Sequence, residues 1–421
     1  MTARALVAWL LVAAIAIAMP WLFYDIVHHR HDGFVISVLS QMGMMTILAL
    51  SYNMLLGQAG LFSLCHATFF GFGGYATVHF LNAAGDGSLL VPMELIPVLG
   101  GFSGLALAVV FGSMATKQRA TAFAMITLGI SELVATAALM FHHFFGGEGG
   151  VTTNRVIDRS LFGLSYASGI QVYYLIVAWT LIAAALMRLQ AATPLGRMAN
   201  ACRDNYERAR FVGYDPRVVR FLQFSLAGFF AGIGGGLYAI TYEIVTFDAV
   251  ATALTANALL MAYIGGTTVF AGPVLGAVLI TLMQSGVSLM SNSWLIYVGV
   301  LFIAMVIFAP SGLAGLILAH RPIVQAGRLH RLAVPYLRLL LPGLATIAGF
   351  VGLVELASFL TIGEAQGKRL MLFGGPIDAT RTGPWLIAGA LLLLGGAWLA
   401  REAGAFRRVW ESLTAETRSA S

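Results

Sequence analysis

Charged side chains that could bind a partner are concentrated in one stretch, Thr193 to Arg220, which reads TPLGRMANACRDNYERARFVGYDPRVVR. Seven arginines lie between Arg188 and Arg220, with three acids among them. Guanidinium groups form ionic and hydrogen-bonded contacts with carboxylates and phosphates. The chemistry predicted for this stretch is therefore docking, because it is the one sizeable hydrophilic interruption in an apolar chain.

Two other segments contain small and polar residues at places where a membrane helix could be interrupted. They are Leu56 to Tyr75 and Ile264 to Pro273. Their candidate pathway residues are Gln58, Ser63, His66, Gly265 and Gly266. Glycine lets a helix break where backbone groups line a cavity instead of lipid. A discontinuous helix beside a translocation pathway and a tight turn between two ordinary spans are equally consistent with the first segment.

Glu132 falls near the middle of a predicted span, residues 121–141. An ionised carboxylate at that depth is costly unless it has a partner or water. We therefore expect Glu132 to face the interior of the bundle. A hydrogen-bonding role between helices is favoured there over a contact with solute.

No residue pattern indicates catalysis, a cofactor or a metal site. The chain contains two lysines, and neither lies in a G-x-x-x-x-G-K-[ST] sequence, so ATP hydrolysis by the P-loop route is excluded. The two cysteines, Cys65 and Cys202, are expected in different compartments, which predicts no disulfide. Energy for active transport would have to come from another subunit or from a gradient.

Composition indicates the elements that position these residues. The chain is 59% hydrophobic and 10% charged, and its mean hydropathy is +0.86, which predicts an all-α polytopic membrane bundle. Runs of about 20 apolar residues cross a membrane, and we expect 10–12 such spans. They are predicted at 5–23, 34–56, 62–81, 91–114, 121–141, 170–188, 220–240, 253–270, 273–290, 294–309, 340–360 and 384–400.

Charge distribution predicts the orientation of these spans. With twelve spans, 18 of the 24 lysines and arginines lie on the same side as both termini, and the positive-inside rule makes that side cytoplasmic. Because basic residues occupy short gaps between spans, membrane topology is favoured over nucleic-acid binding. The first run, MTARALVAWLLVAAIAIAMP, also has the basic start and small-residue end of a cleavable signal peptide, which remains an alternative.

The cytoplasmic loop predicts one amphipathic helix of about five turns. Thr193 suits the N-cap, Pro194 the first helical position and Gly213 the C-terminal stop. Its expected apolar face is Leu195, Met198, Cys202, Tyr206, Ala209 and Val212. Such a helix could dock a soluble partner or lie on anionic lipid, and we favour the partner.

Five ordered sequence blocks resemble the LivM-like permeases of branched-chain amino acid ABC importers. They are LLGQAGLFSLCHATFFGFGGY (Leu55 to Tyr75), TAFAMITLGISEL (Thr121 to Leu133, followed by GGEGGV), TPLGRMANACRDNYERARFVGY (Thr193 to Tyr214), LLMAYIGGTTVFAGPVLGA (Leu259 to Ala277) and FAPSGLAGL (Phe308 to Leu316). The resemblance covers about residues 34–316. It implies an importer-permease bundle within residues 1–318, with a coupling loop at 190–220.

In this family the equivalent loop looks like the element that docks on an ATPase. Glu207, Ala209 and Gly213 match the short Glu-Ala-Ala and Gly signature, and Arg208 departs from its middle position. The predicted coupling residues are thus Arg197, Arg203, Asp204, Glu207, Arg208, Ala209 and Gly213.

Two further features depart from the family pattern. Cys65 stands where such permeases commonly have glycine. Residues 319–421 extend beyond the usual end of the family, and they predict a basic linker, an extra transmembrane hairpin and a cytoplasmic tail.

The resemblance implies the permease subunit of an ATP-driven importer for branched-chain or related amino acids in the bacterial inner membrane. It also implies separate ABC ATPase subunits, a second homologous permease subunit and a periplasmic solute-binding protein. A gradient-driven secondary transporter of small polar solutes is the main alternative, although Glu132 is the one deep charge that such a transporter could use. A membrane-embedded enzyme is less favoured, because no catalytic cluster is apparent.

Overall fold

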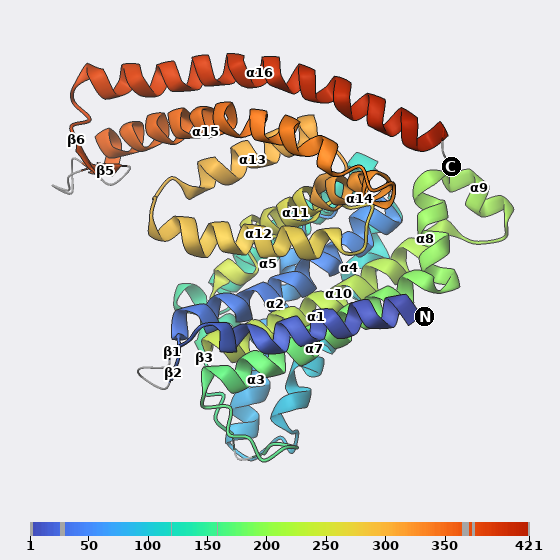
Figure 1. Ribbon diagram of the computed structural model, residues 1–421. Coiled ribbons are helices and arrows are strands. Elements are labelled where there is room, and N and C mark those ends of the chain that lie inside the picture. Colours follow the sequence, from blue (N-terminus) through green and yellow to red (C-terminus); the bar gives the residue numbers. More distant parts are fainter. Residues whose placement is uncertain are drawn as a thin grey trace. The chain divides into compact units, whose positions relative to one another are not determined.

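The computed structural model describes residues 3–25, 30–118, 120–157, 159–363, 370–372 and 375–419. Within these residues the fold is all-α, with short two-stranded ribbons at loops (Figure 1). The helices are α1 (Ala3–Leu22), α2 (Gly33–Asn53), η1 (Met54–Ala59), α3 (His66–Gly85), η2 (Met93–Leu95), α4 (Ile96–Ala115), α5 (Ala120–Met140), α6 (His142–Phe145), η3 (Gly147–Gly149), α7 (Gly169–Ala192), α8 (Pro194–Asp204), α9 (Tyr206–Phe211), α10 (Pro216–Tyr242), η4 (Phe247–Ala249), α11 (Thr252–Gly265), α12 (Gly272–Gly286), η5 (Val287–Leu289), α13 (Trp294–Phe308), α14 (Gly312–Gln325), α15 (His330–Ser358), η6 (Phe359–Gly363) and α16 (Thr382–Ser419). The antiparallel strand pairs are β1 (Tyr24–Asp25) with β2 (Arg30–His31), β3 (Val151–Thr152) with β4 (Ile244–Val245), and β5 (Leu370–Leu372) with β6 (Gly375–Ile377).

A test of helix length and apolarity finds fewer full spans than the 10–12 expected. Eight helices of the described chain are long and apolar enough to cross a membrane, or up to nine if α13 and α14, which meet at a 43° bend, form one span. Every predicted span coincides with a helix, but α11 has 14 residues, and neither α3 nor the described apolar part of α1 meets the same test. Glycine and polar residues lower the hydropathy of α3, and the break after Gly265 shortens α11.

Contacts divide the chain into two compact units, 1–282 with 304–314, and 283–303 with 315–421. In the first unit α10 is the central helix, because 78% of its most apolar window is buried. It packs against α4, α3 and α2. Asp215 begins α10 by accepting a hydrogen bond from the Arg217 backbone N–H at 2.9 Å, and Pro216 follows at the first helical position.

Glycines allow α3, α4 and α10 to approach closely. A Cβ on Gly232 of α10 would lie 2.5 Å from the Gly100 carbonyl oxygen of α4, and a Cβ on Gly73 of α3 would lie 2.5 Å from the Gly232 Cα. Neither distance leaves room for a methyl group. These three helices therefore pack backbone to backbone, as small residues permit in membranes.

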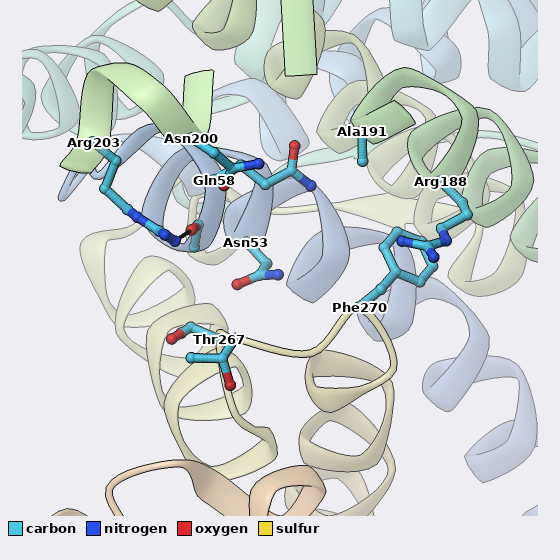
Figure 2. A pocket seen from close by; sticks show the side chains of 10 residues that line it. Asn53, Gln58, Arg188, Ala191, Asn200, Arg203, Thr267 and Phe270 are labelled. Atoms are coloured by element: carbon cyan, nitrogen blue, oxygen red, sulfur yellow. Dashed lines mark hydrogen bonds between the residues drawn. The ribbon is translucent and has the colours of Figure 1, made fainter. Parts of the chain in front are cut away.

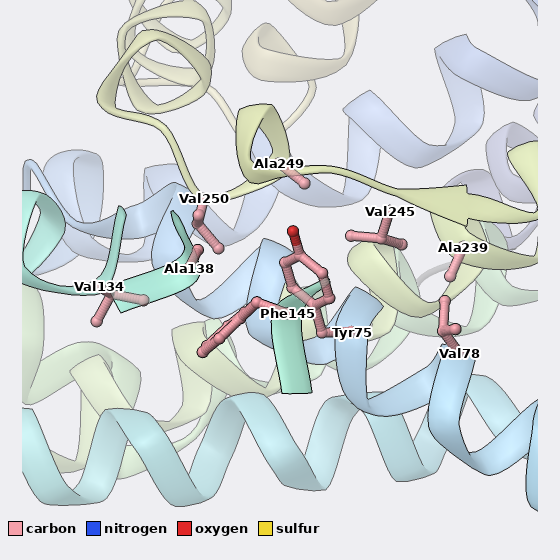
Figure 3. Close-up of a cluster of buried hydrophobic side chains, with 9 residues drawn as sticks. All are labelled: Tyr75, Val78, Val134, Ala138, Phe145, Ala239, Val245, Ala249 and Val250. Carbon is pink, nitrogen blue, oxygen red and sulfur yellow. The ribbon is translucent and has the colours of Figure 1, made fainter. Parts of the chain in front are cut away.

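A hydrophobic cluster ties the loops at one end of this unit to its helices (Figure 3). Tyr75 of α3 lies at its centre, with Phe145 of α6 against it at 4.9 Å between ring centroids. The remaining members are Val78, Val134, Ala138, Ala239, Val245, Ala249 and Val250. On the same side, the backbone N–H of Arg155 donates to the Glu243 carboxylate at 3.0 Å, next to the β3–β4 ribbon.

The second unit contains the long helices α15 and α16, which lie side by side (Figure 1). Gly349 permits their close approach, because a Cβ there would lie 2.3 Å from the Leu392 backbone nitrogen. The Tyr297 hydroxyl donates to Glu355 at 2.5 Å, which gives that carboxylate a partner inside the unit. Residues 319–421 remain predicted as an added hairpin and tail, and no role is assigned to them.

Candidate functional site

The hydrophilic loop between α7 and α10 forms two helices, so the expected single helix from Thr193 to Gly213 is wrong. The backbone is extended at Asn205 (φ −155°, ψ 104°), between α8 and α9. The Asn205 side-chain oxygen accepts from the Arg208 backbone N–H at 2.9 Å, which is an N-cap contact. The end signals are confirmed: the Thr193 hydroxyl accepts from Gly196 N–H at 3.3 Å, and Gly213 adopts φ +88°.

One side of α8 packs on the bundle. Gly196, Ala199 and Cys202 are buried, and α8 contacts α7, α10 and the π-helix η1. Burial raises the pKa of the Cys202 thiol, although Arg220 opposes the shift. The predicted apolar face is thus confirmed at Cys202.

The end of α9 differs from the predicted pattern. Ala209 is buried, but Val212 is 64% exposed and Phe211 is 90% exposed. Glu207 and Arg208 are also exposed. We call Glu207, Arg208, Phe211 and Val212 the α9 surface. It combines charges with an aromatic side chain that no other part of the described chain covers.

The predicted coupling arginines differ in their contacts. Arg203 donates to the Gly57 carbonyl oxygen of η1 and forms an ion pair with Asp204 at 2.9 Å. Arg197 donates to the Ala192 carbonyl at 3.2 Å and so remains local to its own turn. Arg203 therefore joins α8 directly to the first helix interruption.

Gln58 belongs to a chain of amide contacts beside that interruption. Gln223 of α10 donates to the Gln58 side-chain oxygen at 3.0 Å and to the Met54 carbonyl at 3.1 Å. Gln190 of α7 donates to the Gln223 oxygen at 2.7 Å. These contacts hold η1 between α7 and α10. A π-helix of this kind often marks a functional site.

Ser63 and His66 lie in the buried segment before α3 and at its start. His66 is fully buried, and its Nε2 lies 2.9 Å from the Ser51 hydroxyl of α2. The Tyr52 hydroxyl donates to the Ser63 carbonyl at 3.1 Å. The Ser63 hydroxyl lies 3.6 Å from the Cys65 sulfur. Neither Ser63 nor His66 lines the cavity described below. Their assignment to the translocation pathway stays a prediction.

Glu132 does not face the bundle interior, so that expectation is wrong. Its side chain is exposed on α5, and one carboxylate oxygen accepts from the Thr252 hydroxyl of α11 at 2.7 Å. The Thr252 hydroxyl is also 3.1 Å from Ser131. The predicted hydrogen bond between helices is present, but it forms on the outer surface of the first unit.

Gly265 and Gly266 form a tight junction between α11, α12 and the start of α14. A Cβ on Gly265 would lie 2.0 Å from the Gly272 carbonyl oxygen, and one on Gly266 would lie 2.4 Å from the Ser311 carbonyl. Gly266 also adopts φ +107°, a conformation that favours glycine. The residues that follow, Thr267 and Thr268, reach the first interruption.

A polar cavity of about 250 Å³ lies where the two interruptions meet α8. Figure 2 shows Arg203 and Arg188 on opposite sides of this cavity with Asn53 between them. The full lining is Asn53, Gly57, Gln58, Arg188, Ala191, Asn200, Arg203, Thr267, Thr268 and Phe270. We call it the arginine cavity.

Sequence reasoning predicted Gln58 and Arg203 but assigned them to different roles. It missed Asn53, Arg188, Asn200, Thr267, Thr268 and Phe270. Of these residues, Arg188 could have been found from the sequence, because an arginine in the last part of the apolar helix α7 is unusual and indicates a polar site. The proximity of the two interruptions could not be read from the sequence.

Comparisons with known proteins identify the family of the chain. The family model described as "Branched-chain amino acid transport system / permease component" matches residues 34–310. The LivM permease proteins of high-affinity branched-chain amino acid transport in Escherichia coli (strain K12) and Salmonella typhimurium (strain LT2) are each 24% identical over 292 residues, covering 63% of this chain and 67% of theirs. The fructose import permease protein FruF of Bifidobacterium longum is 32% identical over 131 residues, covering 29% of this chain and 36% of its own. No solved structure matches. Because the family match covers more than half of the 421 residues, the chain belongs to the permease components of branched-chain amino acid transport systems.

Proposed function

We propose that this permease is one of two homologous membrane subunits in an ATP-driven, binding-protein-dependent importer of branched-chain amino acids. The observation that carries the coupling role is the α9 surface. An aromatic side chain that is 90% exposed, at Phe211, lies among charges on the basic side of a membrane bundle. Such a combination suits a protein partner, since aromatic residues and arginine are enriched at interface centres.

The contacts of α8 explain how a partner could act on the pathway. The α9 surface follows α8 after a single extended residue, Asn205. α8 is packed on η1 and joined to it by the bond from Arg203 to the Gly57 carbonyl. ATPases that move α9 would therefore displace η1, and this displacement would favour one of the two access states of the permease.

The exposed position of Glu132 supports the proposal of a second membrane subunit. An exposed carboxylate on the membrane-spanning helix α5 is costly against lipid, and its hydrogen bond to Thr252 satisfies one oxygen. Large apolar side chains are exposed on the same helix, including Met125 and Leu133. A homologous permease covering this face would shield Glu132, and the solute pathway would lie between the two subunits.

The opposite end of the first unit suits an external binding protein. The loop after α6 is held against α10 by the Arg155 backbone bond to Glu243 at 3.0 Å and by an Arg155 side-chain bond to the Thr241 carbonyl at 3.1 Å. Its shape is thus fixed by the bundle. We place this end in the periplasm and both termini in the cytoplasm of a bacterial inner membrane, following the positive-inside rule.

The docking role is tested by substitutions on the α9 surface in the assembled importer. Phe211→Asp and Arg208→Glu should each reduce ATP-driven L-leucine uptake and ATPase stimulation by about tenfold or more, because interface hot spots contribute about 2 kcal/mol or more. Expression and membrane insertion should be unchanged, since both side chains are exposed. Arg401→Glu, at an exposed position of α16, is the charge-matched control and should retain uptake.

Copurification of the ATPases separates docking from transport. We expect both α9 variants to lose the ATPases during purification and the Arg401→Glu permease to keep them. Normal uptake with normal copurification in the two α9 variants would exclude this surface as the docking site. ATP-driven uptake of fructose but not of L-leucine by the wild-type importer would correct the cargo and leave the coupling role intact.

A further inference from the structure

The arginine cavity has an excess of positive charge. Arg188 and Arg203 line it, and its lining contains no Asp or Glu. Arg203 is paired with Asp204, whereas no ion pair joins Arg188 to a carboxylate among the residues that the structure describes. The Arg188 guanidinium instead lies 5.5 Å from the centroid of the Phe270 ring. A guanidinium placed beside an aromatic ring at one wall of the cavity can bind a carboxylate with its planar fork.

The same cavity has an unsatisfied acceptor. Asn53 is 3% exposed, and its Oδ1 has no hydrogen-bond partner within the described part of the chain. The point where a Gly57 Cβ would lie is 2.3 Å from Asn53 Oδ1 and 2.6 Å from the Thr267 carbonyl oxygen. The two acceptors therefore converge beside Gly57. A buried acceptor without a partner is costly, so this corner of the cavity suits a donor such as an ammonium group.

We propose that the arginine cavity is a binding site for a free, zwitterionic α-amino acid on the α8 side of the permease. The carboxylate binds Arg188, with Arg203 opposite, and the ammonium donates to Asn53 Oδ1 and the Thr267 carbonyl. This assignment deepens the proposed function and rests on it for the choice of an amino acid. It differs from a simple anion site because the cavity offers acceptors as well as guanidinium groups.

L-Leucine binding to the full-length permease in lipid nanodiscs tests this site without the binding protein or the ATPases. Calorimetry should show saturable binding. Arg188→Gln and Asn53→Leu should each weaken it by about tenfold or more, because each removes a hydrogen bond to a charged group. Arg217→Gln, an exposed position outside the cavity, is the control for loss of one positive charge and should bind L-leucine as the wild type does.

Two analogues of L-leucine identify which group each residue binds. Leucinamide lacks the carboxylate, so its affinity should be insensitive to Arg188→Gln and sensitive to Asn53→Leu. 4-Methylpentanoate lacks the ammonium, so its affinity should show the reverse pattern. Arg188→Lys keeps the charge but loses the planar fork, and it should still weaken L-leucine binding in a chain that is folded.

Unchanged L-leucine affinity in folded Arg188→Lys and Asn53→Leu permeases would overturn the assignment. So would inorganic phosphate that binds as tightly as L-leucine and depends on Arg188 alone, because that result defines a simple anion site. ATP-driven L-leucine uptake by the assembled importer separates the two proposals. Normal uptake without cavity binding overturns this inference alone, whereas cavity binding without any ATP-driven uptake overturns the proposed function.

Discussion

At the scale of single residues, the reactivity of the Cys202 thiol indicates whether α8 remains packed against the bundle. Its side chain is buried beneath α8, and this burial raises the pKa of the thiol. The reactive form of a cysteine is the thiolate. A buried thiol with a raised pKa should therefore react slowly as long as α8 remains packed on η1 and α10.

We expect maleimide to label Cys202 about tenfold more slowly at pH 7 than a cysteine placed at Val212 in a Cys202→Ala chain. Because the pKa is raised, the labelling rate of Cys202 should keep rising with pH beyond the ordinary thiol value of about 8.5, where the rate of an unperturbed thiol begins to level off. Mass mapping of the labelled peptide distinguishes Cys202 from Cys65. Equal labelling rates at the two positions would show that α8 is not packed as described.

Glu132 has a partner on α11 and an exposed surface on α5, and these two features predict different effects of substitution. Glu132→Gln keeps an oxygen for the Thr252 hydroxyl, so uptake should stay within about twofold of the wild type. Glu132→Leu removes the bond between α5 and α11, which should cost about 1 kcal/mol and lower the thermal stability of the purified permease. If Glu132→Gln assembles normally but fails to transport, the negative charge itself acts on solute or on the partner subunit.

Two predictions about the site were wrong, and each concerns one residue: Asn205, whose side chain caps a helix, and Glu132, whose side chain bonds to a neighbouring helix. The ends of the coupling loop were predictable because Thr193 and Gly213 have strong local preferences. The break at Asn205 was missed because apolar residues continue at a spacing of three and four on both sides of it. The position of Glu132 was missed because the cost of a charge in the membrane was taken to require burial within this chain, whereas the side chain is exposed on the surface of the chain.

At the scale of elements, the close packing of α3, α4 and α10 depends on positions without a side chain. Gly232→Ala should destabilise the permease by about 1–3 kcal/mol through overpacking, because its Cβ would lie 2.5 Å from the Gly100 carbonyl. Gly299→Ala in α13 is the matched control, since nothing lies within 4 Å of its Cβ position. There alanine should be neutral or stabilise the helix by up to about 1 kcal/mol.

The difference in stability between the two glycine variants can be measured by thermal unfolding, with the loss of monodisperse permease as the readout. Equal stability of Gly232→Ala and the wild type would contradict the backbone-to-backbone contact. The helices themselves were largely predictable, since long apolar runs require them. Interruptions were predictable at Gly57 and Gly266 but their mutual contact was not, because it depends on how α2, α11 and α12 pack.

At the scale of the whole molecule, two surfaces of the permease are exposed in the single chain in a way that suits contact with other subunits. The α9 surface exposes Phe211, and α5 exposes Glu132 within an apolar span. The family and the membrane location were predictable from motifs and composition. By length and apolarity, eight or nine helices of the described chain qualify as full spans, against the 10–12 expected. One reason is the break after Gly265, which shortens the helix expected at 253–270 to 14 residues.

The most direct test of the central claim is L-leucine uptake into proteoliposomes that contain either this permease alone or the complete importer. We predict uptake only when the second permease, the ATPases, ATP and the solute-binding protein are all present. Accumulation of L-leucine by this permease alone, driven by a proton or sodium gradient, would contradict the account.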